Sequence, residues 1–267
     1  MVNKKYIKII LFFIILCAIV YAQTHLYYSA KTAHLLPKKS IEIGIFQPLR
    51  YSYSNKTEFS LHPLMFLLAP NLQIKKAHKP ILGLHFSSQH NIYYPTLFLK
   101  VIAREGTGGI IAKEFRDDIP HMVSFYNGVL LTKKIRNNLL TLKTGFKFAV
   151  NSNNLDSRTS IDLPLAYPRL QVFHEGNGLQ YGIIITSHIW KKFYVETNIE
   201  LFHFPGSDEN FTFEASNFFS WQKSKKLQIS CGYKFIHGQY PFGKQQHLLP
   251  MIDLKWIFSK KTNSIGC

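Results

Sequence analysis

The last quarter of the chain, residues 193–258, restricts the fold most, because its side chains alternate between apolar and polar over four long stretches. In Phe211–Trp221, aromatic or small apolar residues occupy most odd positions, and threonine, glutamate or serine occupies most even ones. A period of two is typical of β-strands, whose neighbouring side chains point to opposite faces. The stretches are about ten residues long, whereas an ordinary strand has about five or six. Alternating segments of this length, separated by turns, predict a transmembrane β-barrel.

The spacing of the stretches predicts how many strands the barrel has. They begin at Phe193, Phe211, Leu227 and His247, so their starts are 18, 16 and 20 residues apart. We therefore predict an all-β protein, an antiparallel up-and-down transmembrane β-barrel of about 12 strands (range 10–14), an even number as in bacterial barrels. The barrel is predicted to extend over residues 40–258.

Weaker alternation upstream predicts the remaining strands. They are expected at residues 40–46, 57–61, 71–78, 81–90, 123–132 and 139–150. Residues 163–173 and 179–187 are predicted to form a hairpin around the turn HEGNG.

Two regions lack a regular pattern. Residues 63–70 contain an unbroken apolar run between prolines, which indicates either an interfacial loop or a thin membrane-facing piece. Residues 92–121 are too long for a simple connection. They are predicted to be either a loop folded into or over the barrel or two irregular strands.

Both ends of the chain differ from the barrel pattern. Residues 1–22 have a basic start, an apolar run and a small residue at their end, which predicts a cleaved signal peptide. The apolar run, of about twelve residues, is shorter than the roughly 20 residues of a membrane helix. A lipoprotein signal at Cys17 is disfavoured because Leu16 stands where such signals carry a small residue. Residues 23–39 are predicted to be an N-terminal lead-in, and residues 259–267 a polar C-terminal tail.

The charge of the chain indicates its partners. The formal net charge is +17, which raises the question of nucleic acid. The lysines are scattered as pairs at predicted turns in an exported chain, so we exclude nucleic acid as a partner. We interpret the positive charge as basic loops that face anionic lipid headgroups.

Neither the cysteines nor the histidines predict a metal, a cofactor or a disulfide framework. Cys231 and Cys267 alone remain after signal cleavage, and a disulfide between them is not expected. The 12 histidines show no metal-ligand spacing. We predict no metal site and no cofactor.

Charged residues on the polar faces of the strands are the candidate lining of the lumen. They are Lys143, Lys147, Glu196, Glu200, Glu214, Lys234, Asp253 and Lys255. If they point inward, they either pair to fill a closed lumen or line a water path.

Aromatic residues gather at predicted strand ends, where rings sit at headgroup level. The membrane-girdle candidates are Trp190, Trp221, Trp256 and Phe258. On these features the mature chain resembles Gram-negative outer-membrane β-barrel proteins, and its last strand looks like the C-terminal signal read by the barrel-insertion machinery. The resemblance implies an outer-membrane location, with outer-membrane lipids, lipopolysaccharide and that machinery as partners. The nine residues after Phe258 depart from the signal, which usually ends the chain.

One short motif raises the question of catalysis. His85 and Ser87 have the His-x-Ser spacing that resembles outer-membrane lipid hydrolases, in which a base reaches a nucleophile on one strand face. The residue after the serine is Ser88, where those families usually carry asparagine. We therefore interpret these residues as polar lining and favour a non-enzymatic role.

The sequence thus predicts an outer-membrane barrel that acts as a pore, a transporter or a structural component of the envelope. A lipid hydrolase using His85 and Ser87 is one alternative. A soluble exported β-sandwich is the other.

Overall fold

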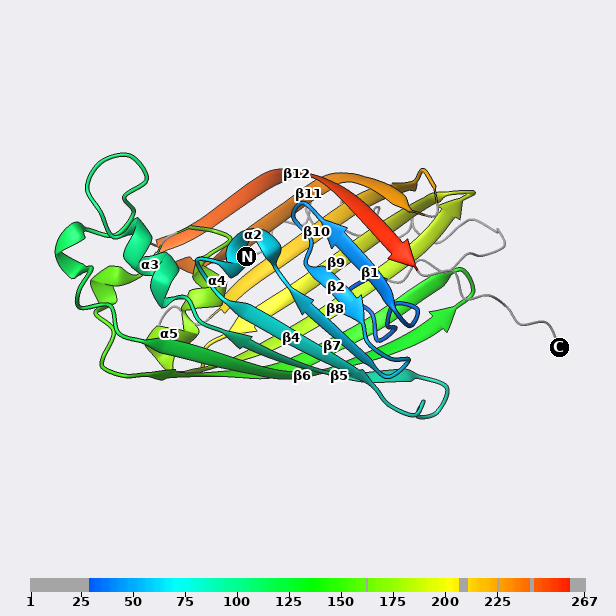
Figure 1. Ribbon diagram of the computed structural model, residues 1–267, viewed down its shortest axis with the longest axis horizontal. Coiled ribbons are helices and arrows are strands. Elements are labelled where there is room, and N and C mark those ends of the chain that lie inside the picture. Colours follow the sequence, from blue (N-terminus) through cyan, green and yellow to red (C-terminus); the bar gives the residue numbers. More distant parts are fainter. Residues whose placement is uncertain (1–28, 162, 207–210, 225, 241–242, 260–267) are drawn as a thin grey trace.

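The described residues form twelve antiparallel strands that close into one barrel in a computed structural model of the chain (Figure 1). The structure describes residues 29–161, 163–206, 211–224, 226–240 and 243–259, so the predicted signal peptide and the tail after Ser259 lie outside it. The strands are β1 (Ser40–Gly44), β2 (Leu49–Ser52), β3 (Thr57–Leu61), β4 (Asn71–Ala77), β5 (His85–Tyr93), β6 (Met122–Ile135), β7 (Asn138–Asn151), β8 (Asn177–Trp190), β9 (Phe193–His203), β10 (Phe211–Gln222), β11 (Leu227–Tyr240) and β12 (Gly243–Ser259). The predicted up-and-down barrel is confirmed. The β-sandwich alternative is wrong, because a single sheet closes on itself.

The barrel closes where the last strand meets the first. Antiparallel pairing runs from Ser40 opposite Ser259 to Gly44 opposite Lys255. In the described part of the chain, β1 therefore pairs with only the last five residues of β12. Pro250 lies in the stretch of β12 beyond this pairing, where a residue without an N–H costs no ladder bond on that side.

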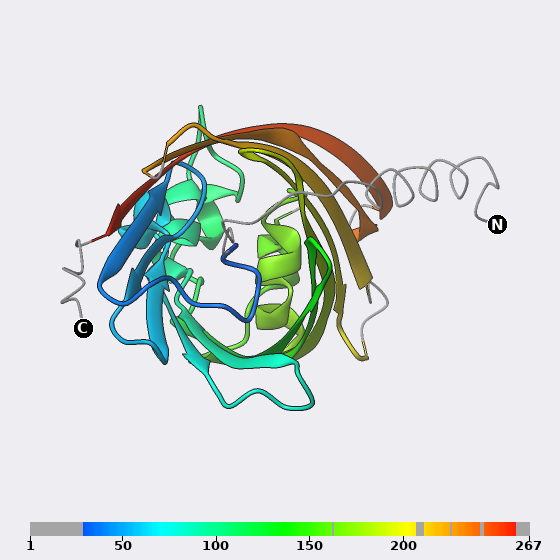
Figure 2. The ribbon, with the colours of Figure 1, turned by 90° about the vertical axis from the view of Figure 1, so that its right-hand side faces the viewer.

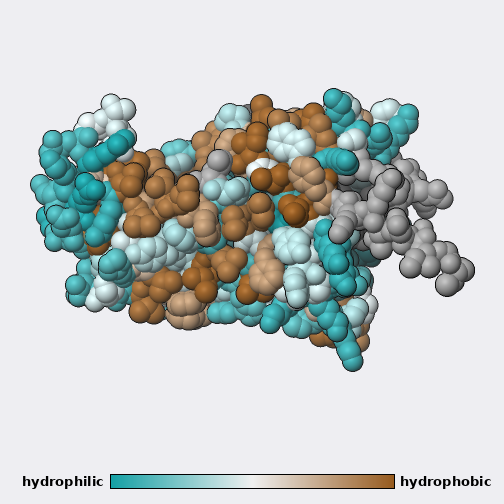
Figure 3. Space-filling view, in the orientation of Figure 1, coloured by the Kyte–Doolittle hydropathy of each residue, from teal (hydrophilic) through white to brown (hydrophobic). Residues whose placement is uncertain are grey.

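Alternation along the strands separates an apolar outside from a polar inside. On β10, Thr212, Glu214 and Ser216 are buried in the lumen, whereas Phe219 and Trp221 are exposed on the outer surface. Figure 3 shows apolar side chains across the middle of one face of the barrel and hydrophilic ones toward both ends. This arrangement is typical of a barrel whose wall faces lipid.

The two ends of the barrel differ. At the short-turn end, connections without helices join β2–β3, β4–β5, β6–β7, β8–β9 and β10–β11, and all but the β4–β5 connection are tight turns. The opposite, long-loop end carries the long connections, with α3, α4 and α5 toward the left of Figure 1 and α2 nearer the middle. The helical segments are α2 (Pro63–Phe66), α3 (Thr96–Ile102), η1 (Lys113–Phe115), η2 (Ser157–Thr159), α4 (Tyr167–Leu170) and α5 (Val172–Glu175). No helix among the described residues has the length and apolar character needed to cross a membrane.

The barrel wall also differs in height around its circumference. We call β1–β4 the short wall, because these strands have 4 to 7 residues. We call β6–β12 the tall wall, because its strands have 11 to 17 residues. The nine residues of β5 lie between the two.

The predicted strand at residues 163–173 is wrong. This segment forms α4 and α5 inside the long connection between β7 and β8. Pro168 stands in the first turn of α4, where a missing N–H and a fixed φ favour a helix start. Leu170, Val172 and Phe173 are buried in the cluster at this end of the barrel, so this part of the hydrophobic run reflects burial rather than a strand.

Other boundaries shift in smaller ways. Alternation did not reveal β2, which has only four residues, and β12 begins at Gly243 rather than His247. Residues 81–84 form a turn, with Leu82 at a φ of +51°. Residues 94–121 are a loop that carries α3 and η1.

Candidate functional site

Five charged side chains form a continuous row on the inner wall where the barrel closes. In order they are Lys255, Glu42, Arg50, Glu58 and Lys75, one each from β12, β1, β2, β3 and β4. Successive nitrogen–oxygen distances are 3.5, 3.0, 2.9 and 3.7 Å. All five are buried. Because an unpaired buried charge costs several kcal/mol, the alternating signs are what permit this charge ladder inside the barrel.

The N-terminal segment, residues 29–39, lies inside the lumen against this ladder (Figure 2). Lys75 Nζ donates to the main-chain oxygens of Ala30 at 2.8 Å and Thr32 at 3.1 Å. Glu58 Oε2 accepts from the main-chain N–H of Leu36 at 2.9 Å. The last two side chains of the ladder therefore also hold the segment.

The tall wall holds the same segment from the opposite side. The N–H of Ala33 donates to Thr132 Oγ1 on β6 at 2.8 Å. Lys31 Nζ lies 3.0 Å from Glu196 Oε1 on β9. Contacts to both walls fix the N-terminal segment across the short-turn half of the lumen.

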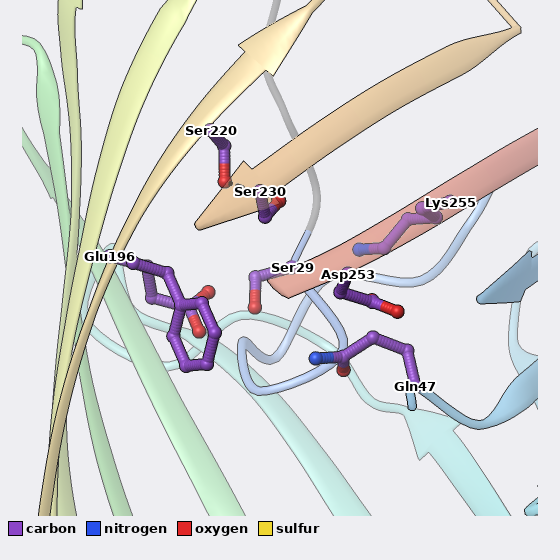
Figure 4. Close-up of a pocket in the computed structure, with 8 residues that line it drawn as sticks. Ser29, Gln47, Glu196, Ser220, Ser230, Asp253 and Lys255 are labelled. Carbon is purple, nitrogen blue, oxygen red and sulfur yellow. Dashed lines mark hydrogen bonds between the residues drawn. The ribbon is translucent and has the colours of Figure 1, made fainter. Parts of the chain in front are cut away.

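A small pocket remains beside the segment (Figure 4). It is lined by Ser29, Gln47, Glu196, Phe218, Ser220, Ser230, Asp253 and Lys255. Asp253 Oδ1 accepts from the N–H of Phe46 at 2.9 Å. The cavity volume of about 20 Å³ is room for about one water molecule.

A second segment enters the lumen from the long-loop end. It is the β7–β8 loop, residues 152–176, which carries α4 and α5 (Figure 2). Arg169 Nη1 lies 2.7 Å from Glu214 Oε1, and Lys234 Nζ lies 2.6 Å from Glu214 Oε2. Lys147 Nζ donates to the main-chain oxygen of Arg169 at 2.7 Å. Charged side chains of β7 and β10 thus hold this loop, and Lys234 of β11 supports Glu214 from the other side.

Apolar packing closes the long-loop end around the same loop. The buried cluster combines residues of α3, α5 and the strand ends: Leu99, Ile102, Ala103, Ile111, Ile119, Met122, Ile161, Leu170, Val172, Phe173, Phe202 and Phe204. On the other side of the loop, the rings of Tyr167 and Tyr240 lie 4.7 Å apart. The β5–β6 and β7–β8 loops therefore form one packed cap.

Between the two segments, the wall carries a further ion pair. Lys143 Nζ lies 2.8 Å from Glu200 Oε1 and 5.6 Å from the centroid of the Tyr126 ring. That ring lies against Gly128 and Gly145, which are register partners on β6 and β7. A Cβ at either glycine would collide with the ring, so both positions need glycine for Tyr126 to lie along the wall.

The structure places the eight lumen candidates on the inner face. Glu196, Glu200, Glu214, Asp253 and Lys255 are buried. Lys143, Lys147 and Lys234 are partly buried, on the same face of their strands.

The sequence reasoning missed several lumen charges. They are Glu42, Arg50, Glu58, Lys75 and Arg169. Glu42 and Glu58 stand at alternating positions in strands that were predicted, so the period of two could have found them. Arg169 lies in a helix within a loop, and no periodicity places it in the lumen.

The four girdle candidates all lie at the short-turn end. Trp190, Trp221, Trp256 and Phe258 are 37–54% exposed on the outer surface. Phe193 links two of them, with its ring 6.1 Å from Trp190 and 6.4 Å from Trp221. These aromatic side chains form one aromatic belt at the short-turn end, as expected at a membrane interface.

The His85–Ser87 pair does not form a catalytic arrangement. Ser87 is fully buried, and its Oγ has no hydrogen-bond partner among the described residues. The ring of His85 lies 4.3 Å from the ring of His34 in the N-terminal segment. Burial, followed by His85 and Lys75, lowers the pKa of His34 to about 4, so His34 is neutral at neutral pH. The lipid-hydrolase alternative is not favoured by this geometry.

No protein-family model matches the sequence, and no curated protein gives a significant match. Solved structures with a similar shape include the NanC porin, with 8% identity, a TM-score of 0.46, and coverage of 82% of this chain and 97% of that one. An outer-membrane channel of the COG4313 group from Pseudomonas putida F1 has 9% identity, a TM-score of 0.48, and coverage of 87% and 99%. The toluene transporter TodX from P. putida has 8% identity, a TM-score of 0.38, and coverage of 83% and 78%.

Proposed function

We propose that this chain is an outer-membrane β-barrel that acts as a pore or transporter for hydrophilic solutes, and that its lumen is occupied here by the chain's own segments. The observation that carries the proposal is the contrast between the two faces of one closed sheet. The outer face is apolar, whereas the inner face is lined by charged and hydrogen-bonding side chains. A polar lumen inside an apolar wall is the architecture of aqueous channels.

The way the lumen is filled supports transport over a purely structural role. Side chains of the strands alone can fill a small barrel. Here the N-terminal segment and the β7–β8 loop fill it instead, and both are held by hydrogen bonds and ion pairs. A terminus and a loop can leave the lumen without breaking the strand pairing that closes the barrel.

The location and partners belong to the same proposal. The aromatic belt at the short-turn end is suited to headgroups on one side of an outer membrane. Lipopolysaccharide and other outer-membrane lipids would surround the wall. The insertion machinery would read β12, which carries Trp256 and Phe258 near its end. Membrane fractionation checks the location, since recovery in the soluble periplasmic fraction without detergent would exclude it.

Conductance in planar bilayers tests the transport function. We expect low conductance for the wild-type chain, because both halves of the lumen are occupied. Deleting residues 23–36 removes most of the N-terminal segment, including its contacts to Lys75, Glu58 and Thr132. A short Gly-Ser link in place of residues 153–175 removes most of the β7–β8 loop. The double variant is expected to give stable steps of larger conductance.

Folding of each variant is controlled by heat-modifiable migration on a denaturing gel, in which a closed barrel runs differently before and after boiling. A double variant that shows the folded band yet conducts no more than empty bilayers would contradict the proposal. The chain would then be a structural component of the envelope.

A further inference from the structure

We propose that the long-loop half of the lumen is an anion-binding site, so that the solutes it admits carry a carboxylate or phosphate group. This inference rests on the proposed transport function and names its substrate class. The site is the basic cluster, which we define as Lys143, Lys147, Arg169 and Lys234.

The basic cluster contains more positive than negative charge. Glu214 accepts from both Arg169 and Lys234, and Glu200 pairs with Lys143. In the described part of the chain, no carboxylate lies within ion-pair distance of Lys147, whose ammonium donates to the main-chain oxygen of Arg169. Four cations therefore share two carboxylates.

The short-turn half of the lumen shows that such an excess is not general. There the cations are Lys31, Arg50, Lys75 and Lys255, and the carboxylates are Glu42, Glu58, Glu196 and Asp253. The numbers are equal, as expected for charges that only hold a wall and a segment together. The positive excess is confined to the half that faces the long loops.

The surroundings of the basic cluster strengthen its attraction for anions. Lys147 Nζ lies 5.9 Å from the ring centroid of Tyr93 and 6.0 Å from that of Phe173, and the Arg169 guanidinium lies 5.6 Å from Phe202. Charges in apolar surroundings are screened less than charges in water. A confined site with a net charge of one sign raises the local concentration of counter-ions, by about 10-fold or more.

Donors remain for an incoming anion. The Arg169 side chain is 40% exposed in the lumen although it is paired with Glu214. An ammonium has three donors, and one hydrogen bond is recorded for Lys147. A carboxylate or phosphate oxygen that accepts from both would satisfy donors that the protein leaves to water.

The first test measures ion selectivity. The variant that lacks only residues 23–36 is placed in planar bilayers under a KCl gradient. It keeps the β7–β8 loop and therefore the whole basic cluster, including Arg169. We expect the reversal potential to have the sign of an anion-selective pore, with about a tenfold preference for chloride. Lys147→Gln should lose most of this preference, and Lys147→Glu should reverse the sign. The matched control is Lys113→Gln, at an exposed position outside the barrel, which should change nothing.

Separate additions of acetate and inorganic phosphate identify the group that binds. The one that reduces the chloride current at the lower concentration is the preferred chemistry. If Lys147→Gln abolishes this block, Lys147 contacts the anion.

The outcomes separate this inference from the proposed function. A conducting barrel without anion preference, or one whose selectivity is unchanged by Lys147→Gln, overturns the anion site and leaves the pore intact. If no variant conducts, the anion site is tested by calorimetry instead, which measures the binding of inorganic phosphate and of acetate to the detergent-folded protein. Binding that is lost in Lys147→Gln supports the site, and no binding to the wild-type chain overturns it.

Discussion

The short wall and the tall wall differ in what holds their strands together. Neighbouring strands β10 and β11 pair from Thr212 to Gln222, whereas β1 and β2 pair only at Ile41–Tyr51 and Glu42–Arg50. The charge ladder lies behind the short wall, and the N-terminal segment rests on it. The difference indicates that buried ion pairs and an internal segment replace backbone pairing where the strands are short.

The two walls also differ in height, measured along the strands. A strand rises about 3.4 Å per residue, so the five residues of β1 span about 17 Å. This is less than the roughly 25 Å apolar band of outer-membrane barrels. Above β3, α2 and the residues after it continue the apolar surface, with Leu67 82% exposed and Phe66 40% exposed. Of the two readings of residues 63–70, this placement favours a membrane-facing piece.

The largest effect is expected from opening the seam between the walls. Deleting Leu254–Cys267 removes every residue of β12 that pairs with β1 and removes Lys255 from the ladder. We expect no closed barrel, because each unpaired backbone group in hydrocarbon costs several kcal/mol. Heat-modifiable migration measures this. Deleting only residues 260–267 is the control and should preserve the folded band. A folded band after the longer deletion would mean that the short wall does not depend on the seam.

The next effect concerns the charge ladder itself. Arg50→Met leaves Glu42 and Glu58 buried without the cation between them, which should cost about 3–5 kcal/mol. Lys143→Met in the tall wall disrupts one ion pair behind long strand pairing, and we expect a smaller loss. Urea unfolding in detergent or lipid vesicles compares the two. Equal losses would refute the view that ion pairs matter more where strands are short.

A charge placed on the lipid-facing side of the tall wall tests how deep each position lies in the membrane. Ile183 is 47% exposed in the middle of β8, and Ile135 is 45% exposed at the end of β6. Ile183→Arg should cost about 2–4 kcal/mol, and Ile135→Arg about 0–1 kcal/mol, because the penalty falls from midplane to interface. The same unfolding measurement applies. Similar costs at both positions would contradict the assigned depth of the tall wall.

The smallest effect is a change in labelling rather than in stability. Leu67→Cys, in a chain with Cys17→Ser, Cys231→Ser and Cys267→Ser, leaves one thiol, on the surface above β3. We expect a lipid-soluble maleimide to label it in vesicles and a membrane-impermeant, water-soluble one to label it poorly. An exposed position such as Lys113→Cys in the same background should react with the water-soluble reagent. Equal reaction at Leu67→Cys would place α2 in water and leave the short wall incomplete.

The sequence by itself determined the fold class and the faces of most long strands. Residues two apart share a face whatever the neighbouring strand is, so the alternation in β10 and β7 could be interpreted without tertiary structure. Closure of the barrel follows from the predicted fold class, because a barrel in lipid leaves no open edge, and the structure closes it by pairing β12 with β1. Short strands such as β2 carry too few residues to show a period.

Tertiary structure alone decided how the lumen is occupied. Glu42, Arg50 and Glu58 are each eight residues apart in the chain and become neighbours only through strand register. The N-terminal segment and α4 have no period of their own that points into a barrel, and their positions depend on partners as distant as Thr132 and Glu214. Local alternation specifies which way a side chain points, whereas contacts between distant segments exist only after the sheet has closed around them.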